Sequence, residues 1–266
     1  MRTVPIVQVD TFTRRPFAGN PAAVCILDEL PPEWWLCDVA REINLSRTAC
    51  LIPHEDGFDL RWFAPDREVD LCGHATLASA HVLWEEGHLR ADQPARFHTR
   101  GGELIAHLRA GWIEIDFPAR PVSLQPAPCG LAEALGVEIL WVGSDGTDLL
   151  VELADEKTVR TLCPDLAAIA RIPVRGVVVT SRAITSGVDF VSRFFAPRQG
   201  VPEDPVTSSA HCALAPFWSE RLGAQCLTGY QVSARGGTVR VTMNGSRVLI
   251  AGQAVTVLRG SILGHE

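Results

Sequence analysis

The chain has 266 residues and a formal net charge of −7, with 47% hydrophobic and 21% charged residues. This acidic balance argues against nucleic acid as a partner, and no apolar run reaches the roughly 18 residues that a membrane span needs. The single lysine, Lys157, lies in the charged segment ELADEKTVR, where it is poorly placed for Schiff-base or pyridoxal phosphate chemistry. The composition favours a globular protein that binds small molecules.

The cysteines and the N-terminus both indicate a reducing compartment. Eight cysteines are scattered along the chain with no CxxC pair, which is neither a disulfide framework nor a zinc cluster. Asp10 stands where a signal peptide would still be apolar. We therefore expect a cytoplasmic protein with no metal site and no membrane partner.

The first part of the chain is expected to alternate short strands with two helices. Runs rich in β-branched and aromatic residues predict strands at residues 4–9, 22–27, 49–52, 58–63 and 104–108. The segment EWWLCDVAREI, which follows Pro32, has apolar residues at helical spacing and predicts a helix. A second helix, from His74 through Glu86, is rich in Ala and Leu and is expected to be largely buried.

An internal repeat follows from short matching segments. RWFAP in the first half corresponds to RFFAP in the second, and each is followed by a Glu-led segment and then by RGG. Gly73 and Ser208 are 135 residues apart, and so are Arg100 and Arg235. Two landmarks at one offset and in one order indicate a duplication.

The duplication predicts an α+β fold of two similar halves, each a curled sheet around a central helix, with a pseudo-two-fold relation and a cleft between them. The second central helix is expected from Ser209 to Leu222, interrupted by Pro216. Four prolines within residues 117–130 disfavour regular structure there. We expect a first half at 1–118, a proline-rich linker at 119–130 and a second half at 131–266. An alternative is that the last strand of the chain returns to the first half.

Small or polar residues open both buried helices. Free backbone N–H groups and the helix dipole make such ends suitable for anions. If the two halves face each other, both ends point into one cleft that suits a small carboxylate-bearing substrate, with His74, Asp204 and Cys72 as ionisable groups. Proton transfer at a carbon next to a carboxylate is then the natural reaction class. The alternative is that these residues act only as helix caps.

Several longer segments can be compared with known families. In chain order they are VDTFTRRPFAGNPAAVCIL, the NLS segment, RWFAP, LCGHATLA, RFFAP, EDPVTSSAH, LAPFWSERLG and QVSARGG. Together they resemble the phenazine-biosynthesis-like family, which has a diaminopimelate-epimerase-like fold. The resemblance covers nearly the whole chain. It implies isomerase or epimerase activity without metal or organic cofactor, resembling the isomerisation of trans-2,3-dihydro-3-hydroxyanthranilate, in a protein that is commonly a homodimer.

The resemblance also implies roles for individual residues. Hydrogen bonds to the substrate are implied for His74 and Asp204, and a place in the same cleft is implied for Asn20. The helix ends would hold the substrate through Gly73, Ser208 and Ser209. Cys72 corresponds to one of the two cysteines of related racemases. The second half has Thr207 at the other cysteine position, which argues against a two-thiol mechanism.

One position departs from the family pattern in a way that bears on the chemistry. The family motif NLSET carries the proton-transferring Glu, and this chain reads NLSRT, with Arg47 at that position. Arginine keeps its proton near neutrality and cannot act as an acid or base. Three hypotheses stay open: another group (Asp204, His74 or Cys72) is the base, or Arg47 binds an anionic group of a different substrate, or the protein binds a metabolite without catalysis. A smaller departure is Ser208, where the family has Gly.

Overall fold

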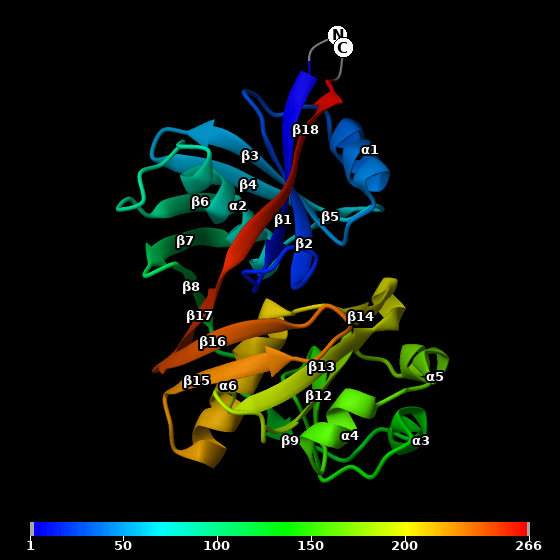
Figure 1. Cartoon of the computed structure of the whole chain (residues 1–266). Helices are drawn as coiled ribbons and strands as arrows, with labels where there is room; N and C mark the ends of the chain where they lie inside the picture. Colours follow the sequence, from blue (N-terminus) through cyan, green and yellow to red (C-terminus); the bar gives the residue numbers. More distant parts are fainter. Residues whose placement is uncertain (1–2, 265–266) are drawn as a thin grey trace. The chain divides into compact units, whose positions relative to one another are not determined.

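A computed structural model describes residues 3–264 of the chain. Its residues form two compact units: unit 1 contains the described residues up to Asp116 and those from Ala251 onward, and unit 2 contains Phe117–Ile250. Each unit combines a sheet with a few helices (Figure 1), so the predicted α+β class is confirmed. The proline-rich segment 119–130 belongs to unit 2. No helix in the described part of the chain has the length and apolar character of a membrane span.

Unit 1 is built on one sheet. Its elements are β1 (Thr3–Thr11), β2 (Asn20–Ile26), α1 (Glu33–Ile43), β3 (Thr48–His54), β4 (Gly57–Phe63), β5 (Glu68–Val69), α2 (Gly73–Glu85), β6 (Ala95–Thr99), β7 (Gly102–Arg109), β8 (Trp112–Pro118) and β18 (Ala254–Leu263). Neighbouring strands follow the order β18, β1, β2, β3, β4, β6, β7, β8, and β5 pairs with β4. The pairs β2–β3 and β4–β6 are parallel, and the others are antiparallel.

The two helices of unit 1 cover different parts of the sheet. Helix α2 is buried on nearly all sides and packs against β1, β2, β3 and β18, because its three alanines and one serine let the strands come close. Helix α1 buries Trp35, Leu36 and Val39 in a cluster with residues of β1, β2 and β3. It ends at Asn44, whose left-handed backbone (φ 53°) is a conformation that Asn adopts readily. This turn leads the chain directly to Ser46 and Arg47.

Unit 2 repeats the strand pairing of unit 1. Its elements are β9 (Ser123–Leu124), α3 (Leu131–Leu135), β10 (Trp141–Ser144), β11 (Asp148–Glu152), α4 (Glu156–Thr161), α5 (Leu166–Arg171), β12 (Gly176–Arg182), β13 (Phe190–Ala196), a 3-10 turn η1 (Pro197–Gln199), β14 (Val201–Asp204), α6 (Ser208–Leu222), β15 (Cys226–Gln231), β16 (Gly237–Asn244) and β17 (Arg247–Gly252). Neighbours follow the order β9, β10, β11, β12, β13, β15, β16, with β14 on β13. The pairs β11–β12 and β13–β15 are parallel. From β9 to β16 in unit 2, parallel and antiparallel pairs therefore follow one another in the same order as from β18 to β7 in unit 1.

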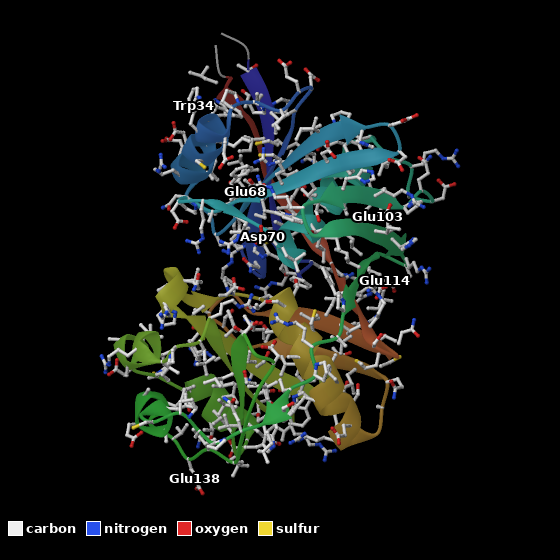
Figure 2. The ribbon with its side chains drawn as sticks, turned by 180° about the vertical axis from the view of Figure 1, so that it is seen from behind. Trp34, Glu68, Asp70, Glu103, Glu114 and Glu138 are labelled. Carbon is white, nitrogen blue, oxygen red and sulfur yellow. The ribbon has the colours of Figure 1, made fainter. Side chains whose placement is uncertain are left out.

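The repeat extends to side chains. In unit 1 the Arg61 guanidinium donates to Glu68, 2.8 Å between Nε and Oε1, and lies 5.2 Å from the ring centre of Phe63. In unit 2 the RFFAP arginine donates to Glu203 at 2.7 Å and lies 4.9 Å from the ring of the equivalent phenylalanine. Glu68 lies on the short strand β5 (Figure 2). The repeated segments therefore preserve an ion pair stacked on an aromatic ring.

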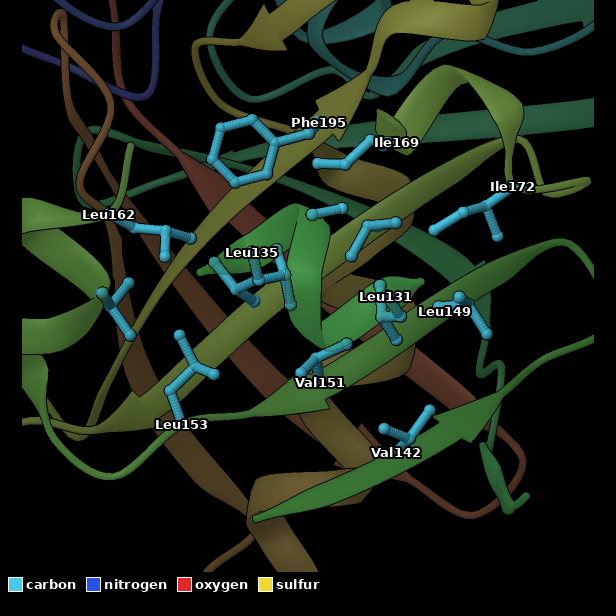
Figure 3. Close-up of a cluster of buried hydrophobic side chains, with 14 of the residues drawn as sticks. Leu131, Leu135, Val142, Leu149, Val151, Leu153, Leu162, Ile169, Ile172 and Phe195 are labelled. Atoms are coloured by element: carbon cyan, nitrogen blue, oxygen red, sulfur yellow. The ribbon is translucent and has the colours of Figure 1, made fainter. Parts of the chain in front are cut away.

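The helices α3, α4 and α5 of unit 2 enclose an apolar cluster with the sheet. Leu135, Val151 and Phe195 are among its buried members (Figure 3). Helix α6 continues through Pro216 and is not interrupted there as the sequence predicted. Proline lacks the N–H that would bond the carbonyl four residues earlier. That carbonyl, of Cys212, accepts a hydrogen bond from the backbone N–H of Arg120 at 2.9 Å, which removes part of the cost of the proline.

Candidate active site

The N-terminus of α2 forms the first part of the candidate site. Cys72 is the N-cap residue with an extended backbone, and no side chain in the described part of the chain caps the helix. The Cys72 carbonyl accepts bonds from the N–H and the hydroxyl of Thr76, at 3.0 and 2.7 Å. The N–H groups of the first turn, which begins at Gly73, therefore have no capping side chain and can bind an anion.

His74 is the second residue of this helix and is held from both sides of its ring. Its Nδ1 lies 3.4 Å from Cys72 Sγ, and its Nε2 lies 3.3 Å from Ser46 Oγ. Burial lowers the pKa of His74 to about 3, and the nearby charge of Arg47 adds to this effect. The imidazole is therefore neutral near pH 7, where it can offer hydrogen bonds and is a weak base.

Arg47 lies in the connection between α1 and β3 and is half-buried. Its backbone carbonyl accepts a bond from Ala23 of β2 at 3.2 Å, and its guanidinium donates to the carbonyl of Ser46. Its charge acts on His74, so it lies near the N-terminus of α2. Within residues 3–264 no carboxylate forms an ion pair with Arg47. A cation without a counter-charge beside a helix N-terminus attracts anions.

Asn20 opens β2 in the same unit and is completely buried. In the parallel pairing of β2 with β3, Ala23 is opposite Thr48. Asn20 and Arg47 therefore lie at the same end of these two strands, where both strands begin. The preceding loop needs Gly19, because its φ is +66° and a Cβ there would lie 2.0 Å from the carbonyl oxygen of Thr11. The FAGNP segment is therefore a tight turn that fixes the start of β2.

The N-terminus of α6 forms the second part of the candidate site. Thr207 is its N-cap residue, and its hydroxyl donates to Asp204 Oδ2 at 2.5 Å instead of capping the helix. The side chain of Gln231 joins this network: its Oε1 accepts from the Thr207 N–H at 2.9 Å, and its Nε2 donates to the Asp204 carbonyl at 2.7 Å. Asp204 is partly exposed, so its carboxylate is held in place and still reaches solvent.

The two serines of this helix start differ in their surroundings. Ser208 is buried, and its hydroxyl has no hydrogen-bond partner among the residues that the structure describes. Ser209 Oγ accepts a hydrogen bond from Arg175 Nη2 at 3.0 Å. Arg175 is also bound by both oxygens of Asp148, with 2.8 Å between Nε and Oδ1. Burial alone would lower the pKa of Arg175, but Asp148, Asp145 and Asp204 outweigh it and raise the pKa.

The structure thus assembles the predicted residues in two groups. Cys72, Gly73, His74 and Arg47 come together at α2, while Asp204, Ser208 and Ser209 come together at α6. The predicted cleft that would join the groups stays a prediction. Sequence analysis missed the contact residues Ser46, Arg175 and Gln231. Only Ser46 had a signal in the sequence, as the neighbour of Arg47 in the NLSRT segment.

Each unit packs a buried helix against a sheet and has ionisable groups at the start of that helix. A structure titled as a probable proline racemase from Agrobacterium radiobacter K84 superposes with a TM-score of 0.65, covering 98% of this chain and 93% of that chain. At 13% identity this likeness shows the fold alone. The predicted α+β fold of two similar halves is therefore confirmed, while the cleft between the halves stays a prediction.

The family follows from closer similarities. Residues 9–260 match the family model described as phenazine biosynthesis-like protein, and the chain belongs to that family. An uncharacterized isomerase of Halalkalibacterium halodurans is 48% identical over 264 residues, which are 99% of this chain and 100% of that protein. The crystal structure of a PhzF-family protein from Enterococcus faecalis has a TM-score of 0.94 and 38% identity, and covers 98% of this chain and 100% of that chain. The predicted family is confirmed.

Proposed function

We propose that this chain is an isomerase that moves a proton on a small carboxylate-bearing substrate, and that Arg47 holds an anionic group of that substrate. Membership of the phenazine biosynthesis-like family and the isomerase name of a 48%-identical relative support the reaction class. The observation that carries the proposal is the half-buried Arg47 guanidinium, which acts on His74 and has no carboxylate partner within residues 3–264. Arginine supplies a fixed positive charge with donors arranged for a carboxylate.

Another side chain must then transfer the proton, and Asp204 is the best candidate. Its carboxylate is oriented by Thr207 and is partly exposed. His74, with a pKa of about 3, is a weak base near neutrality and suits a hydrogen-bonding role. Cys72, whose sulfur lies 3.4 Å from Nδ1 of His74, is the alternative base.

The proposed step begins with proton removal from a substrate carbon by the Asp204 carboxylate. The C–H electron pair moves into the adjacent unsaturated system, where the substrate carboxylate delocalises it. The next step relies on the predicted cleft, in which Arg47 and the N–H groups at the start of α2 stabilise the negative charge that develops. Protonated Asp204 then returns the proton to a different carbon, so the product is an isomer of the substrate and no other reactant is consumed.

Solvent exchange tests this step directly. The substrate is trans-2,3-dihydro-3-hydroxyanthranilate, incubated with the protein in D₂O and followed by NMR for deuterium at carbon. We expect exchange with the wild type, a loss of roughly 10²- to 10⁴-fold with Asp204→Asn, and no change with Asp92→Asn, an exposed carboxylate paired with Arg90. Undiminished exchange with Asp204→Asn would contradict the role of Asp204 as base, and loss of exchange with Cys72→Ser would then assign that role to Cys72.

A second candidate function is binding of an anionic metabolite without turnover, and the same residue favours it, because Arg47 cannot transfer a proton. Such a protein would be stabilised against heat by its ligand and would exchange no C–H proton of any ligand that binds. The predicted homodimer and cytoplasmic location stay predictions, which size-exclusion chromatography and cell fractionation test.

A further inference from the structure

Three side chains of unit 1 come together at the turn of the β3–β4 hairpin. His54 ends β3, Asp56 lies in the two-residue turn, and His98 lies on β6. One carboxylate oxygen, Asp56 Oδ1, lies 2.9 Å from His54 Nδ1 and 2.8 Å from His98 Nε2. The two imidazole rings have centres 4.3 Å apart. One nitrogen of each ring and one carboxylate oxygen all lie within 4.8 Å of one another.

The sheet fixes the backbone under these three groups. In the β3–β4 pairing His54 is opposite Gly57, which closes the hairpin, and in the parallel β4–β6 pairing Asp59 is opposite His98. Gly57 has no room for a side chain, because a Cβ there would lie 2.6 Å from the carbonyl oxygen of Arg96. The hairpin therefore contacts β6 closely and brings two strands and a turn to one point.

The surroundings of this cluster suit a cation. Arg96, two residues before His98, is already paired with Glu103 across β6 and β7 at 3.0 Å, and Glu103 is directly opposite His98 in this pairing. His54 and Asp56 are exposed and His98 is half-buried, so an ion from solvent can reach all three.

This position is separate from the candidate active site. Arg47 immediately precedes β3, while His54 is the last residue of that strand. Seven residues of extended chain span about 20 Å at roughly 3.3 Å per residue. A ligand at His54 therefore does not touch Arg47 or the start of α2.

We propose that His54, Asp56 and His98 bind a divalent transition-metal ion such as Zn²⁺, Ni²⁺ or Cu²⁺. Two imidazole nitrogens and a carboxylate oxygen are ligands that these ions prefer, whereas Ca²⁺ and Mg²⁺ prefer sites made of oxygen alone. The ion replaces the hydrogen bonds that the histidines share on Asp56 Oδ1, and water completes its coordination. It ties the β3–β4 hairpin to β6 and takes no part in the proposed isomerase step.

Calorimetric titration of the full chain with ZnCl₂ at pH 7.5 tests the site. We expect one equivalent to bind, with affinity at least tenfold weaker in His54→Gln and His98→Gln and unchanged in His88→Ala, an exposed histidine of another loop. Exposed thiols can also take up zinc, so Cys129, Cys163 and Cys226 are first blocked with iodoacetamide. Circular dichroism verifies that each variant is folded.

Two further readouts separate metal binding from a cluster that only forms hydrogen bonds. Cu²⁺ bound at this site gives an electron paramagnetic resonance spectrum with coupling to imidazole nitrogen, which either glutamine variant changes. Zn²⁺ raises the Tm of the wild type and leaves the Tm of the variants unchanged. The proposal is overturned if the wild type takes up no ion, or if both glutamine variants bind it as tightly as the wild type.

Discussion

The starts of the two buried helices, α2 in unit 1 and α6 in unit 2, occupy equivalent places in the two units. The side chains available beside them for a ligand have opposite charges. Strand pairing sets Cys50 opposite Arg61 and Val179 opposite Arg193, which makes Ser46 and Arg175 equivalent, four residues earlier in each case. Each contacts the second residue of its helix: Ser46 Oγ lies 3.3 Å from His74, and Arg175 donates to Ser209 at 3.0 Å. One contact is therefore preserved while both of its side chains have changed.

The difference lies in how charge is balanced. In unit 1 the cation Arg47 has no carboxylate partner within the described residues, and the neighbouring His74 is neutral. In unit 2 the cation Arg175 is bound by Asp148, and the carboxylate of Asp204 is held by Thr207. One helix start is therefore suited to binding an anion and the other to presenting a carboxylate. A duplicated scaffold can supply two different chemical roles from equivalent positions.

The largest effect on stability is expected from Arg175→Ala. Asp148 is almost completely buried, so the variant leaves a buried carboxylate without its partner, which costs about 3 kcal/mol of unfolding free energy. Urea unfolding followed by tryptophan fluorescence measures the change, and Arg90→Ala, from an exposed ion pair, should change little. Adding Asp148→Asn should restore part of the loss. A loss of the same size in Arg90→Ala would contradict the difference between the two ion pairs.

A smaller effect is expected from pH, and it compares the buried histidine of each helix. Burial is the main cause that lowers the pKa of His74 to about 3 and that of His211 to about 4. Both values lie below the ordinary 6.5, so as pH falls below 6.5 the unfolded chain binds protons that the folded chain does not, and stability decreases. At pH 5 each histidine accounts for a loss of about 2 kcal/mol relative to neutral pH.

Urea unfolding at pH 7.5 and pH 5 measures this loss. His74→Gln and His211→Gln should each reduce the difference between the two pH values, because glutamine does not titrate. If either variant keeps the pH dependence of the wild type, that histidine does not have the lowered pKa described for it.

The smallest effect is expected on ligand affinity at the start of α2. Arg47→Ala removes charge-assisted hydrogen bonds worth about 1.5 kcal/mol, which corresponds to roughly tenfold in affinity. We expect phthalate, with two carboxylates, to lose more affinity than benzoate in calorimetric titrations. Arg41→Ala, an exposed arginine paired with Asp38, is the control. Equal affinities of the wild type and Arg47→Ala for phthalate would show that Arg47 does not bind anions.

Local sequence patterns predicted the elements that carry the site but not their mutual contacts. Pro32 and the apolar spacing after it predicted α1, and the Ala-rich run predicted α2. The prediction of an interruption at Pro216 was wrong. The carbonyl of Cys212, which the proline leaves without a helical partner, accepts a bond from the N–H of Arg120, 92 positions before Cys212 in the sequence. No local pattern reveals such a contact.

The same limit applies to the candidate site. His74 and Asp204 were found because they stand at the predicted starts of the two buried helices, in segments that also resemble a family. Arg175 and Gln231 were missed because both are distant in sequence from the helix start: Arg175, just before β12, is 34 residues from Ser209, and Gln231, at the end of β15, is 24 residues from Thr207. Their roles depend on strand register, which short segments of sequence do not determine.

The most direct test of the account is turnover of trans-2,3-dihydro-3-hydroxyanthranilate by the wild type and by Arg47→Glu, assayed spectroscopically side by side. The account predicts that the wild type converts this substrate, since Asp204 transfers the proton and Arg47 holds an anionic group. Turnover by Arg47→Glu alone, or by neither protein, would contradict the account. The first of these results would show an intact scaffold that Arg47 has redirected to another substrate or to binding alone.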